Sequence, residues 1–479
     1  MEQPFATIRA PMVTPRIVPR AEHPISRSNI DPDALKVLNR LRHFGHVAYL
    51  VGGSVRDLLL ERRPKDFDIG TSAHPYEIKR AFRNCWIVGR RFRLAHVKFG
   101  LKTIEVATFR RQISEADLDT GPAPDSSEAV AGDTGEITAA DDHAKGPAAA
   151  AGTSRDHLIY RDNVFGTPEE DAFRRDFTVN ALFYDIATFS IIDYVGGLDD
   201  LRARVIRCIG DPDIRFREDP VRMLRAIVLA ARLDFTVDPP IVDAIRRHAS
   251  EIARSAPARL LDELYKILRS GASERAFREL ADVGLLQWIA PELLAIKDDA
   301  LWQSLASLDA YRRQSEAPPE SLTNAVLLGT ILAPLGFTGR RAMAAEGDTM
   351  ASEPREEGGG RKRPRSRREW RDPKTALGIL PLARRDIERL GQVLGLQRKL
   401  KETQASPRAK RALMHRGPFP EALTWLEIHG GSTSDVVDHW RRLVEVNGPT
   451  APPEDDQRAR YPRRRRRRGR GRRPPVGIE

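Results

Sequence analysis

The chain has 479 residues and a formal net charge of +12, and 41% of its residues are hydrophobic, which predicts two or three domains with real cores and a polyanionic partner. Only two cysteines, Cys85 and Cys208, are present, which argues against a disulfide scaffold or a structural zinc site. The sequence shows neither a run of 18 apolar residues nor the apolar core of a secretory signal, so no membrane span is expected and a cytoplasmic location is predicted.

The first elements in chain order are an arm, a helix and a strand. Residues 1–30 are basic and interrupted by prolines, which predicts a flexible arm. Asp31 and Pro32 are typical of a helix start, an N-cap with Pro at the first helical position, and Gly45 is typical of the helix end. Residues 46–51 (HVAYLV) then predict a strand that leads into a Gly-Gly turn.

Residues 51–71 (VGGSVRDLLLERRPKDFDIGT) carry the most informative pattern. On a strand, residues i and i+2 point to the same face, so Asp66 and Asp68 would aim two carboxylates at one spot. Gly52 and Gly53 can bring backbone N–H groups close to phosphates. Alone, each of these features is more often a solvated strand end or a simple turn. Their order of strand, Gly-Gly, short helix, loop and Asp-x-Asp predicts a metal-dependent nucleotidyl-transfer site.

Residues 77–82 predict a helix, and residues 86–100 and 103–110 predict two strands of a hairpin that turns at Gly100. Alternation along the second strand places Glu105 opposite the apolar residues on either side of it. Two divalent ions need two or three carboxylates, so we predict Glu105 as a third metal ligand. The alternative is a surface residue on a half-exposed strand.

Residues 112–157 are rich in Gly, Pro, Ala and Ser, with ten acidic and two basic residues, which predicts a disordered acidic insertion. Order returns near Tyr160, and a strand pair is predicted around residues 181–185 and 190–194. Upstream of this strand pair, the chain carries a dense charged patch.

Within residues 169–185 (EEDAFRRDFTVNALFYD), the two arginines Arg174 and Arg175 could clamp a triphosphate, since guanidinium groups bind phosphate through forked donors. Asp176 could hold a ribose hydroxyl or orient an arginine, and Asn180 follows it closely. The alternative is a salt-bridged loop.

The helical part of the chain begins near Asp213, and its first long helix is predicted over residues 217–233. Asp219 and Arg222 would be i, i+3 neighbours on one face of this helix, with Arg225 further along it. A carboxylate beside a guanidinium can read a base edge, accepting from an amine and donating to ring nitrogens. The alternative is a surface ion pair on the helix.

Further helices are predicted to about residue 335, a low-complexity stretch over 338–373, and more helices over 382–446. The stretch 458–473 has 11 arginines and no acidic residue, which suits RNA phosphates; binding to DNA or to a membrane surface is the alternative. The arginines predicted to bind RNA are Arg463, Arg464, Arg465, Arg466, Arg467 and Arg468.

Together these elements predict an α+β protein: a small head with a mixed β-sheet, followed by a long all-α neck, body and tail, with disordered insertions and a basic C-terminal tail. The predicted divisions are an arm (1–30), a head (31–200), a helical neck for nucleotide and RNA binding (201–290), a helical body and tail (291–448), and a disordered Arg-rich tail (449–479).

Four ordered motifs resemble the class II nucleotidyltransferases, the family of bacterial poly(A) polymerases and CCA-adding tRNA nucleotidyltransferases. Residues 52–71 resemble the family's first motif, Arg174–Leu182 the second, Asp193–Arg207 the hinge motif, and Glu218–Arg225 the motif that serves as template for the incoming base. The resemblance implies a nucleotidyltransferase head and no nucleic-acid template.

The resemblance also implies site residues: catalytic metals, Mg²⁺ or Mn²⁺, on Asp66 and Asp68, an active-site role for Asp176, and contact of Asp219 and Arg222 with the base. The remaining nucleotide-binding residues that we predict lie in the same motifs and are Gly52, Gly53, Arg56, Arg174, Arg175, Asn180 and Arg225.

Residues 87–100 (IVGRRFRLAHVKFG) and the Arg-rich tail are similar to the bacterial poly(A) polymerases, which favours addition of AMP from ATP over the CCA-adding activity. A non-catalytic RNA-binding protein is a more distant alternative, because the expected carboxylates and arginines are all present. The implied partners are ATP and the RNA 3′ ends of mRNAs, small RNAs and tRNA precursors, with RNA-decay proteins as further candidates and a monomer as the default state. The insertion over 112–157 is longer and more acidic than expected of the family.

Overall fold

The computed structural model describes residues 14–89, 93–111, 164–296, 298–314, 319–337, 376–431 and 434–447. The chain forms two compact units, Met1–Gly391 and Gln392–Glu479. The predicted division between head and neck therefore lies inside the first unit. None of the helices in the described part of the chain is long and apolar enough to cross a membrane.

An eight-stranded mixed sheet forms the N-terminal part of the first unit, in the order β1-β8-β7-β2-β3-β6-β5-β4. Only β3 and β6 are parallel neighbours, and the other pairs in this sheet are antiparallel. Its strands are β1 (Arg16–Val18), β2 (Ala48–Val51), β3 (Ile69–Thr71), β4 (Cys85–Val88), β5 (Leu94–Phe99), β6 (Lys102–Thr108), β7 (Leu182–Asp185) and β8 (Ser190–Asp193).

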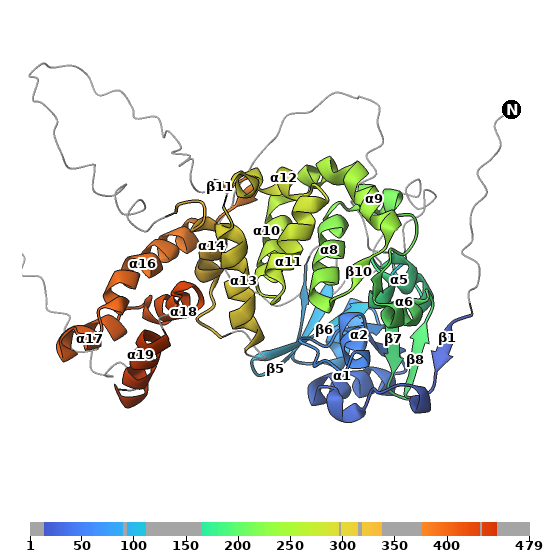
Figure 1. The fold of residues 1–479 in the computed structure, drawn as a ribbon. Coiled ribbons are helices and arrows are strands. Elements are labelled where there is room, and N and C mark those ends of the chain that lie inside the picture. Colours follow the sequence, from blue (N-terminus) through green and yellow to red (C-terminus); the bar gives the residue numbers. More distant parts are fainter. Residues whose placement is uncertain are drawn as a thin grey trace, which may run out of the picture. The chain divides into compact units, whose positions relative to one another are not determined.

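Short helices pack around this sheet (Figure 1). The first begins as predicted: the Asp31 carboxylate accepts a hydrogen bond of 2.8 Å from the N–H of Asp33, and Pro32 is the first helical residue. The helical elements of this region are η1 (Arg20–Glu22), η2 (Arg27–Asn29), α1 (Pro32–His43), α2 (Gly53–Leu59), α3 (Pro75–Ala81), α5 (Pro168–Arg174), η3 (Thr178–Asn180) and α6 (Gly197–Ala203).

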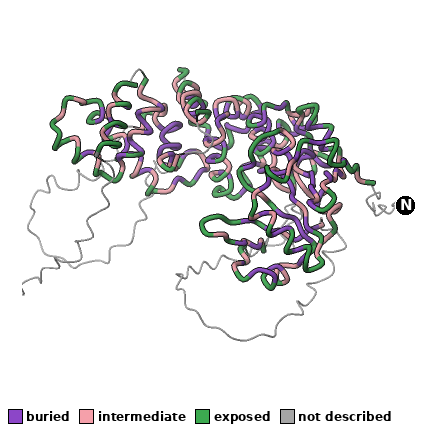
Figure 2. The backbone as a smooth tube through the Cα atoms, turned by 90° about the horizontal axis from the view of Figure 1, so that it is seen from below, coloured by how far each residue is buried: buried purple, intermediate pink, exposed green. Residues whose placement is uncertain are grey.

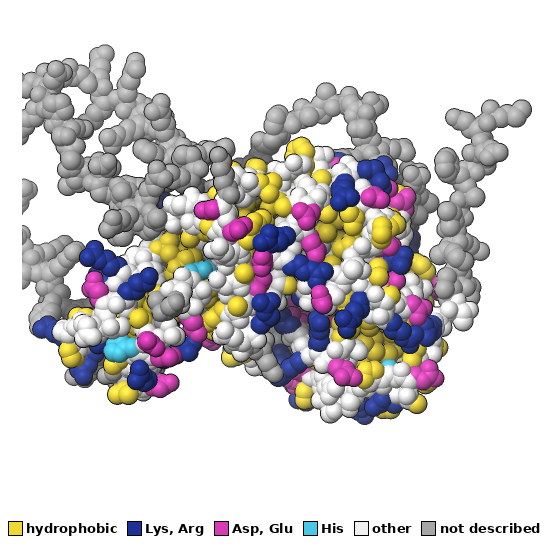
Figure 3. All heavy atoms as spheres, viewed as in Figure 1, with side chains coloured by type: hydrophobic (Ala, Val, Ile, Leu, Met, Phe, Trp, Pro, Cys, Tyr) yellow, Lys and Arg dark blue, Asp and Glu magenta, His cyan; other side chains and the backbone are white. Residues whose placement is uncertain are grey.

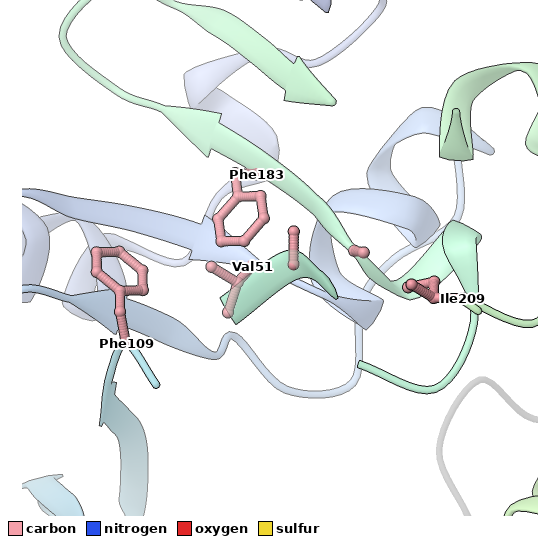
Figure 4. Packing of buried hydrophobic residues seen from close by; sticks show 6 residues of the cluster. Val51, Phe109, Phe183 and Ile209 are labelled. Carbon is pink, nitrogen blue, oxygen red and sulfur yellow. The ribbon is translucent and has the colours of Figure 1, made fainter. Parts of the chain in front are cut away.

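Apolar side chains from distant parts of the sequence meet beneath the sheet. Figure 4 shows Val51, Phe109, Phe183 and Ile209 gathered into one cluster, in which each is at most 6% exposed. The cluster joins the end of β2 to the ends of β6 and β7. It therefore fixes the strand ends from which the candidate site residues extend.

Helices make up most of the rest of the first unit, as predicted. Its elements are β9 (Val205–Ile206), α7 (Pro212–Glu218), α8 (Val221–Leu233), β10 (Thr236–Val237), α9 (Pro239–His248), η4 (Ala249–Arg254), α10 (Pro257–Leu268), α11 (Ser273–Asp282), α12 (Leu286–Ile289), η5 (Pro291–Ala295), α13 (Ala300–Arg313), α14 (Asn324–Leu332), β11 (Ala376–Leu377) and β12 (Leu380–Pro381). Figure 2 shows buried segments along the inner sides of these helices and through the sheet.

The second unit contains most of α16 (Arg384–Lys401), then α17 (Pro407–Met414), α18 (Phe419–His429) and α19 (Ser434–Asn447). Trp440 is fully buried, its indole N–H donates to the carbonyl of Leu400 at 2.8 Å, and its ring lies 5.6 Å from that of Phe419. One aromatic side chain thus ties α16, α18 and α19 together.

The α+β class is confirmed, but the structure differs from the prediction in three places. The flexible arm is wrong over its described part, because Arg16–Val18 forms β1 and pairs with β8. The strand predicted over 86–100 is two antiparallel strands, β4 and β5. The helix predicted over 217–233 is divided, since Asp219 adopts an extended φ of −147° at the end of α7.

Several predictions fall outside the described residues: the insertions at 112–157 and 338–373, and the tail from residue 449 with its arginines at 463–468.

Candidate active site

The Gly-Gly turn joins β2 to α2 and brings the backbone close to arginine side chains. Gly52 has a φ of +69° and ψ of −132°, a conformation that L side chains rarely adopt. A methyl group on Gly52 would lie 3.0 Å from Nη1 of Arg175, and one on Gly53 would lie 3.3 Å from Nη2 of Arg56. Both backbone geometry and crowding therefore require glycine at the first of these positions.

A chain of polar contacts links α2, η3 and α8. The Arg56 side chain is buried, it pairs with Asp57, and its Nη1 donates to the side-chain oxygen of Asn180. The Asn180 amide donates in turn to Asp176 at 3.1 Å, and the second Asp176 oxygen lies 2.6 Å from Nη2 of Arg225. Four predicted site residues from three motifs are thus connected in one network.

This network sets the charge state of Asp176. Burial works to raise the pKa of Asp176, but the Arg225 guanidinium and the Asn180 amide hold that pKa below its usual value. Asp176 is therefore an anion that stays ionised at neutral pH.

A second network fixes the two neighbouring arginines. Asp171 is 3% exposed and accepts from Nε of Arg174 at 2.9 Å and from Nη2 of Arg175 at 2.8 Å. Although burial opposes it, these guanidinium groups hold the pKa of Asp171 below its usual value. Arg175 also donates to the carbonyl of Asn180 at 3.1 Å. Asp171 was not among the predicted site residues, although it lies three and four residues before the two arginines, which are the last residue and the C-cap of α5.

Arg215 of α7 connects this loop to the helical region and was also missed. Its side chain is buried, and its Nη2 donates to the carbonyls of Arg174 and Arg175 at 2.6 and 2.7 Å. The two contacts join residues 40 and 41 positions apart in sequence, so a local sequence pattern does not predict them.

The predicted carboxylates lie together at the end of β3 but not on that strand. Asp66 and Asp68 precede Ile69, the first residue of β3, and the carbonyl of Asp68 accepts from the N–H of Val51 at 3.1 Å. Ile69 pairs with Val106 in the parallel β3–β6 ladder, which brings Asp68 beside Glu105.

The carboxylates act on one another electrostatically. Partial burial and then the charges of Glu105 and Asp66 raise the pKa of Asp68 to about 6, while Arg175 works in the opposite direction. A divalent cation would offset this like-charge repulsion, and carboxylate oxygens are the ligands that Mg²⁺ and Mn²⁺ prefer. In the described ranges, however, no three His, Cys, Asp or Glu side chains converge closely enough to hold a metal. The donor chemistry fits a divalent ion, and the ligand roles remain predictions.

The residues predicted to read the base have other partners than expected. Asp219 ends α7 instead of lying on α8, and its two oxygens accept from Arg259 of α10 at 3.2 and 2.9 Å. Nη1 of Arg222 donates to Glu218 at 2.9 Å and to the carbonyl of Arg215 at 3.1 Å. The predicted side-by-side pair on one helix is therefore wrong in its geometry, although both residues lie at the junction of α7 and α8.

Charged side chains of both signs surround this junction. Figure 3 shows Lys and Arg interspersed with Asp and Glu over the middle of one face, where α8, α10 and α11 lie in Figure 1. Desolvation of the guanidinium and then the charge of Arg56 lower the pKa of Arg232, an exposed residue near the end of α8; Arg62 and Arg225 add to this effect and Asp57 opposes it. This accumulation of positive charge suits a polyphosphate ligand.

Comparison with known proteins places this site in a recognised domain. Residues 48–207 match the family described as "Poly A polymerase head domain", and residues 234–297 match "Probable RNA and SrmB- binding site of polymerase A". The first match includes the Gly-Gly turn, the carboxylates and the residues of both arginine networks except Arg225.

Curated relatives include poly(A) polymerase I of Salmonella typhi, 45% identical over 279 residues (58% of this chain, 54% of the relative), and that of Haemophilus influenzae, 41% identical over 280 residues (58% and 56%). The CCA-adding enzyme of Lactobacillus johnsonii is 34% identical over 252 residues (53% and 54%). The chain spans about half the length of the curated relatives it matches.

Among solved structures, the chain resembles the Bacillus stearothermophilus CCA-adding enzyme in complex with CTP, with a TM-score of 0.55 and 23% identity over 87% of this chain and 83% of that one. This likeness shows a shared fold.

Proposed function

We propose that this chain, a relative of the bacterial poly(A) polymerases that carries their head domain, is a template-independent polynucleotide adenylyltransferase that adds AMP from ATP to RNA 3′ ends. The observation that carries the proposal is the 160-residue head-domain match over residues 48–207, which encloses the carboxylates and, apart from Arg225, the arginine networks described above. A polymerase A RNA-binding region follows it at residues 234–297.

In the proposed reaction the RNA 3′-hydroxyl loses its proton to solvent and its oxygen bonds to the α-phosphorus of ATP. The bond from that phosphorus to the α,β-bridging oxygen breaks, and pyrophosphate leaves. A divalent ion, Mg²⁺ or Mn²⁺, held by Asp66 and Asp68 with Glu105 would supply activation of the hydroxyl and neutralisation of the leaving group. The side chains of the two arginine networks would orient the triphosphate so that attack is in line.

The phosphate-binding role follows from the shape of the turn and its arginines. The Gly52 N–H already donates to the carbonyl of Leu182 at 3.1 Å, so a phosphate would have to contact the turn at Gly53 and through Arg56 and Arg175, which approach the two glycines closely. Asp171 restrains Arg174 and Arg175, so that little side-chain entropy is lost when they bind a phosphate.

Residues at the junction of the predicted head and neck would bind the ribose and the base of ATP. Asp176 and Asn180 present ionised and amide oxygens suited to ribose hydroxyls. Both hydrogen bonds of Arg222 in the described part of the chain use Nη1, which leaves Nη2 and Nε to donate to a base. Arg259 would hold Asp219 as the acceptor for an exocyclic amine.

A CCA-adding activity is the second candidate, because the fold is shared with a CCA-adding enzyme and the relatives include such enzymes at 34% identity. The higher identity of 45% to a poly(A) polymerase I favours AMP addition. A non-catalytic RNA-binding protein is disfavoured, since all of the proposed carboxylates and arginines are present.

The test is primer extension with single nucleotides and Mg²⁺ on an A-rich RNA and on a tRNA that lacks its CCA end. Long ladders with ATP on both RNAs support the poly(A) polymerase. Addition that stops after two C and one A, and only on the tRNA, supports the CCA-adding enzyme. No extension of either RNA contradicts both.

We further propose mRNAs, small RNAs and tRNA precursors as the RNA substrates, a monomeric state and a cytoplasmic location. RNA-decay proteins are the partner class to test first, because poly(A) tails alter the accessibility of RNA 3′ ends.

A further inference from the structure

One face of the β4–β5–β6 part of the sheet is open to solvent. Along β5 and β6, alternate residues such as Ala95, Val97, Ile104 and Val106 are buried, and α3 packs against β4 and β5. The residues between them point to the opposite face. Trp86 on β4, the edge strand of the sheet, is 52% exposed, which is unusual for so large an apolar side chain.

This open face leads directly to the proposed catalytic carboxylates. Trp86 pairs with His96, and His96 pairs with Glu105. In the β3–β6 ladder, Ile69 pairs with Val106, so Asp68 is the next member of the row. Adjacent strands lie about 4.8 Å apart, so three strand spacings put Trp86 about 14 Å from the Asp68 backbone.

A positive charge lies beside the aromatic ring at the start of this row. Nζ of Lys98 lies 5.1 Å from the centre of the Trp86 ring, and Lys98 is itself exposed. Nε2 of His96 lies 3.8 Å from a carboxylate oxygen of Glu105. Aromatic rings that stack bases, next to cations that contact phosphates, are what single-stranded nucleic acid binds in proteins.

We propose that this face, made by Trp86, His96 and Lys98 and here termed the β4–β5 platform, binds the single-stranded 3′ end of the RNA substrate. A base stacks on Trp86, a phosphate contacts Lys98, and the strand continues past His96 to present its 3′-hydroxyl at the carboxylates. At about 3.4 Å per stacked nucleotide, the 14 Å row accommodates about four nucleotides. The proposal rests on the proposed function, which makes RNA the occupant.

The charge and position of the platform favour RNA over a protein partner. An exposed cation over the ring offers a phosphate contact, and the row ends at the site where a 3′-hydroxyl must react. Stacking is tolerant of sequence, because every base has a π-face. Such a platform therefore suits an enzyme that accepts many RNAs.

The test is binding of a 5′-fluorescein oligoadenylate, 12 nucleotides long, to the full chain without ATP, followed by fluorescence polarisation. Trp86→Ala should weaken binding by about 5- to 150-fold, the range for loss of one base–aromatic contact, and Trp86→Phe should restore most of it. The matched control is Phe44→Ala, since Phe44 is also 52% exposed and has a cation, Arg40, 5.6 Å from its ring centre.

Lys98→Glu should also weaken binding and should lower the slope of log affinity against log salt by about 0.7, the value for one lost contact to a single strand. Lys79→Glu on α3, an exposed lysine on the opposite side of the sheet, is the control for net charge. An unchanged salt slope in the Lys98 variant would overturn the phosphate contact.

The outcome separates the platform from the proposed function. If Trp86→Ala binds the oligonucleotide as tightly as the wild type, the platform is wrong even where the wild type makes poly(A). If that variant binds weakly while the wild type extends no RNA, the platform stands and the proposed function fails.

Photo-crosslinking of the wild type decides the question if the variant does not fold. The probe is an RNA with 4-thiouridine at the fourth nucleotide from its 3′ end. A crosslink in the peptide that contains Trp86 supports the platform, and a crosslink confined to other peptides overturns it.

Discussion

Asn180 connects two charged residues of the candidate site, so replacing it tests whether their positions matter for ATP binding. Its side-chain oxygen accepts from Arg56 and its amide donates to Asp176. Asn180→Ala deletes both hydrogen bonds, and each has a charged partner. Hydrogen bonds to charged groups contribute about 1.5–3 kcal/mol each to the free energy of unfolding. Because Asn180 is only half-buried, water can replace part of the lost hydrogen bonding. We therefore expect a loss of about 2–4 kcal/mol in folding stability.

The larger expected effect is on ATP. Without Asn180, the guanidinium that approaches the Gly-Gly turn and the carboxylate proposed for the ribose lose their common restraint. We expect KM for ATP to rise by about 10- to 100-fold, equivalent to about 1.4–2.7 kcal/mol, with a smaller change in KM for RNA. Initial rates of AMP incorporation at saturating RNA and varied ATP measure this, at a temperature where the variant is folded.

A matched control is Asn324→Ala, because Asn324 also accepts a hydrogen bond from an arginine, Arg269, but lies in α14, outside the candidate site. It should lower stability without changing KM for ATP. A wild-type kcat/KM for ATP in Asn180→Ala, or an equal rise in KM for ATP in both variants, would show that Asn180 does not position the ATP-binding side chains.

Three further predictions concern the turn, the base-reading acidic residue and the second unit. Gly52→Ala should lower kcat/KM for ATP at least tenfold in the same assay, because it combines backbone strain with crowding. The control Gly45→Ala, at φ +84° with no atom within 4 Å of the added methyl, should lower the free energy of unfolding by only about 1 kcal/mol. Equal activity of the two variants would contradict this. Arg259→Leu removes both hydrogen bonds that this side chain donates to the half-buried Asp219. It should reduce discrimination of ATP over CTP several-fold with an almost unchanged Tm, as read from competing incorporation; unaltered discrimination would show that Arg259 does not position the carboxylate. Burial lowers the pKa of His429 to about 4, whereas the same side chain in the unfolded chain titrates near 6.5. The contribution of neutral His429 to the free energy of unfolding should therefore be fully present above about pH 6.5 and fall by up to about 3 kcal/mol as pH decreases towards 4. An identical pH dependence of unfolding in the wild type and in His429→Gln would contradict this.

The sequence predicts local structure where the cause is local. Asp31 and Pro32 start α1 because capping and a fixed φ act within one turn. The grouping of Asp66 and Asp68 was predictable too, although the two residues precede β3 instead of lying on it.

Contacts between distant residues could not be predicted in this way. Arg259 binds Asp219 from 40 residues away, and Arg215 binds the carbonyls of Arg174 and Arg175 from a similar distance. Such partners depend on how helices pack, and a helical pattern fixes only which face is apolar. The edge pairing of Arg16–Val18 with β8 is equally non-local.

The most direct test of the central claim is extension of an oligoadenylate with labelled ATP and Mg²⁺ by the wild type and by Asp68→Asn. The proposed site predicts a ladder of added AMP with the wild type, and incorporation below a few per cent of that with the variant, while the oligonucleotide still binds with near wild-type affinity. A variant that extends RNA at more than a few per cent of the wild-type rate would contradict the assignment of the reaction to the carboxylates at β3.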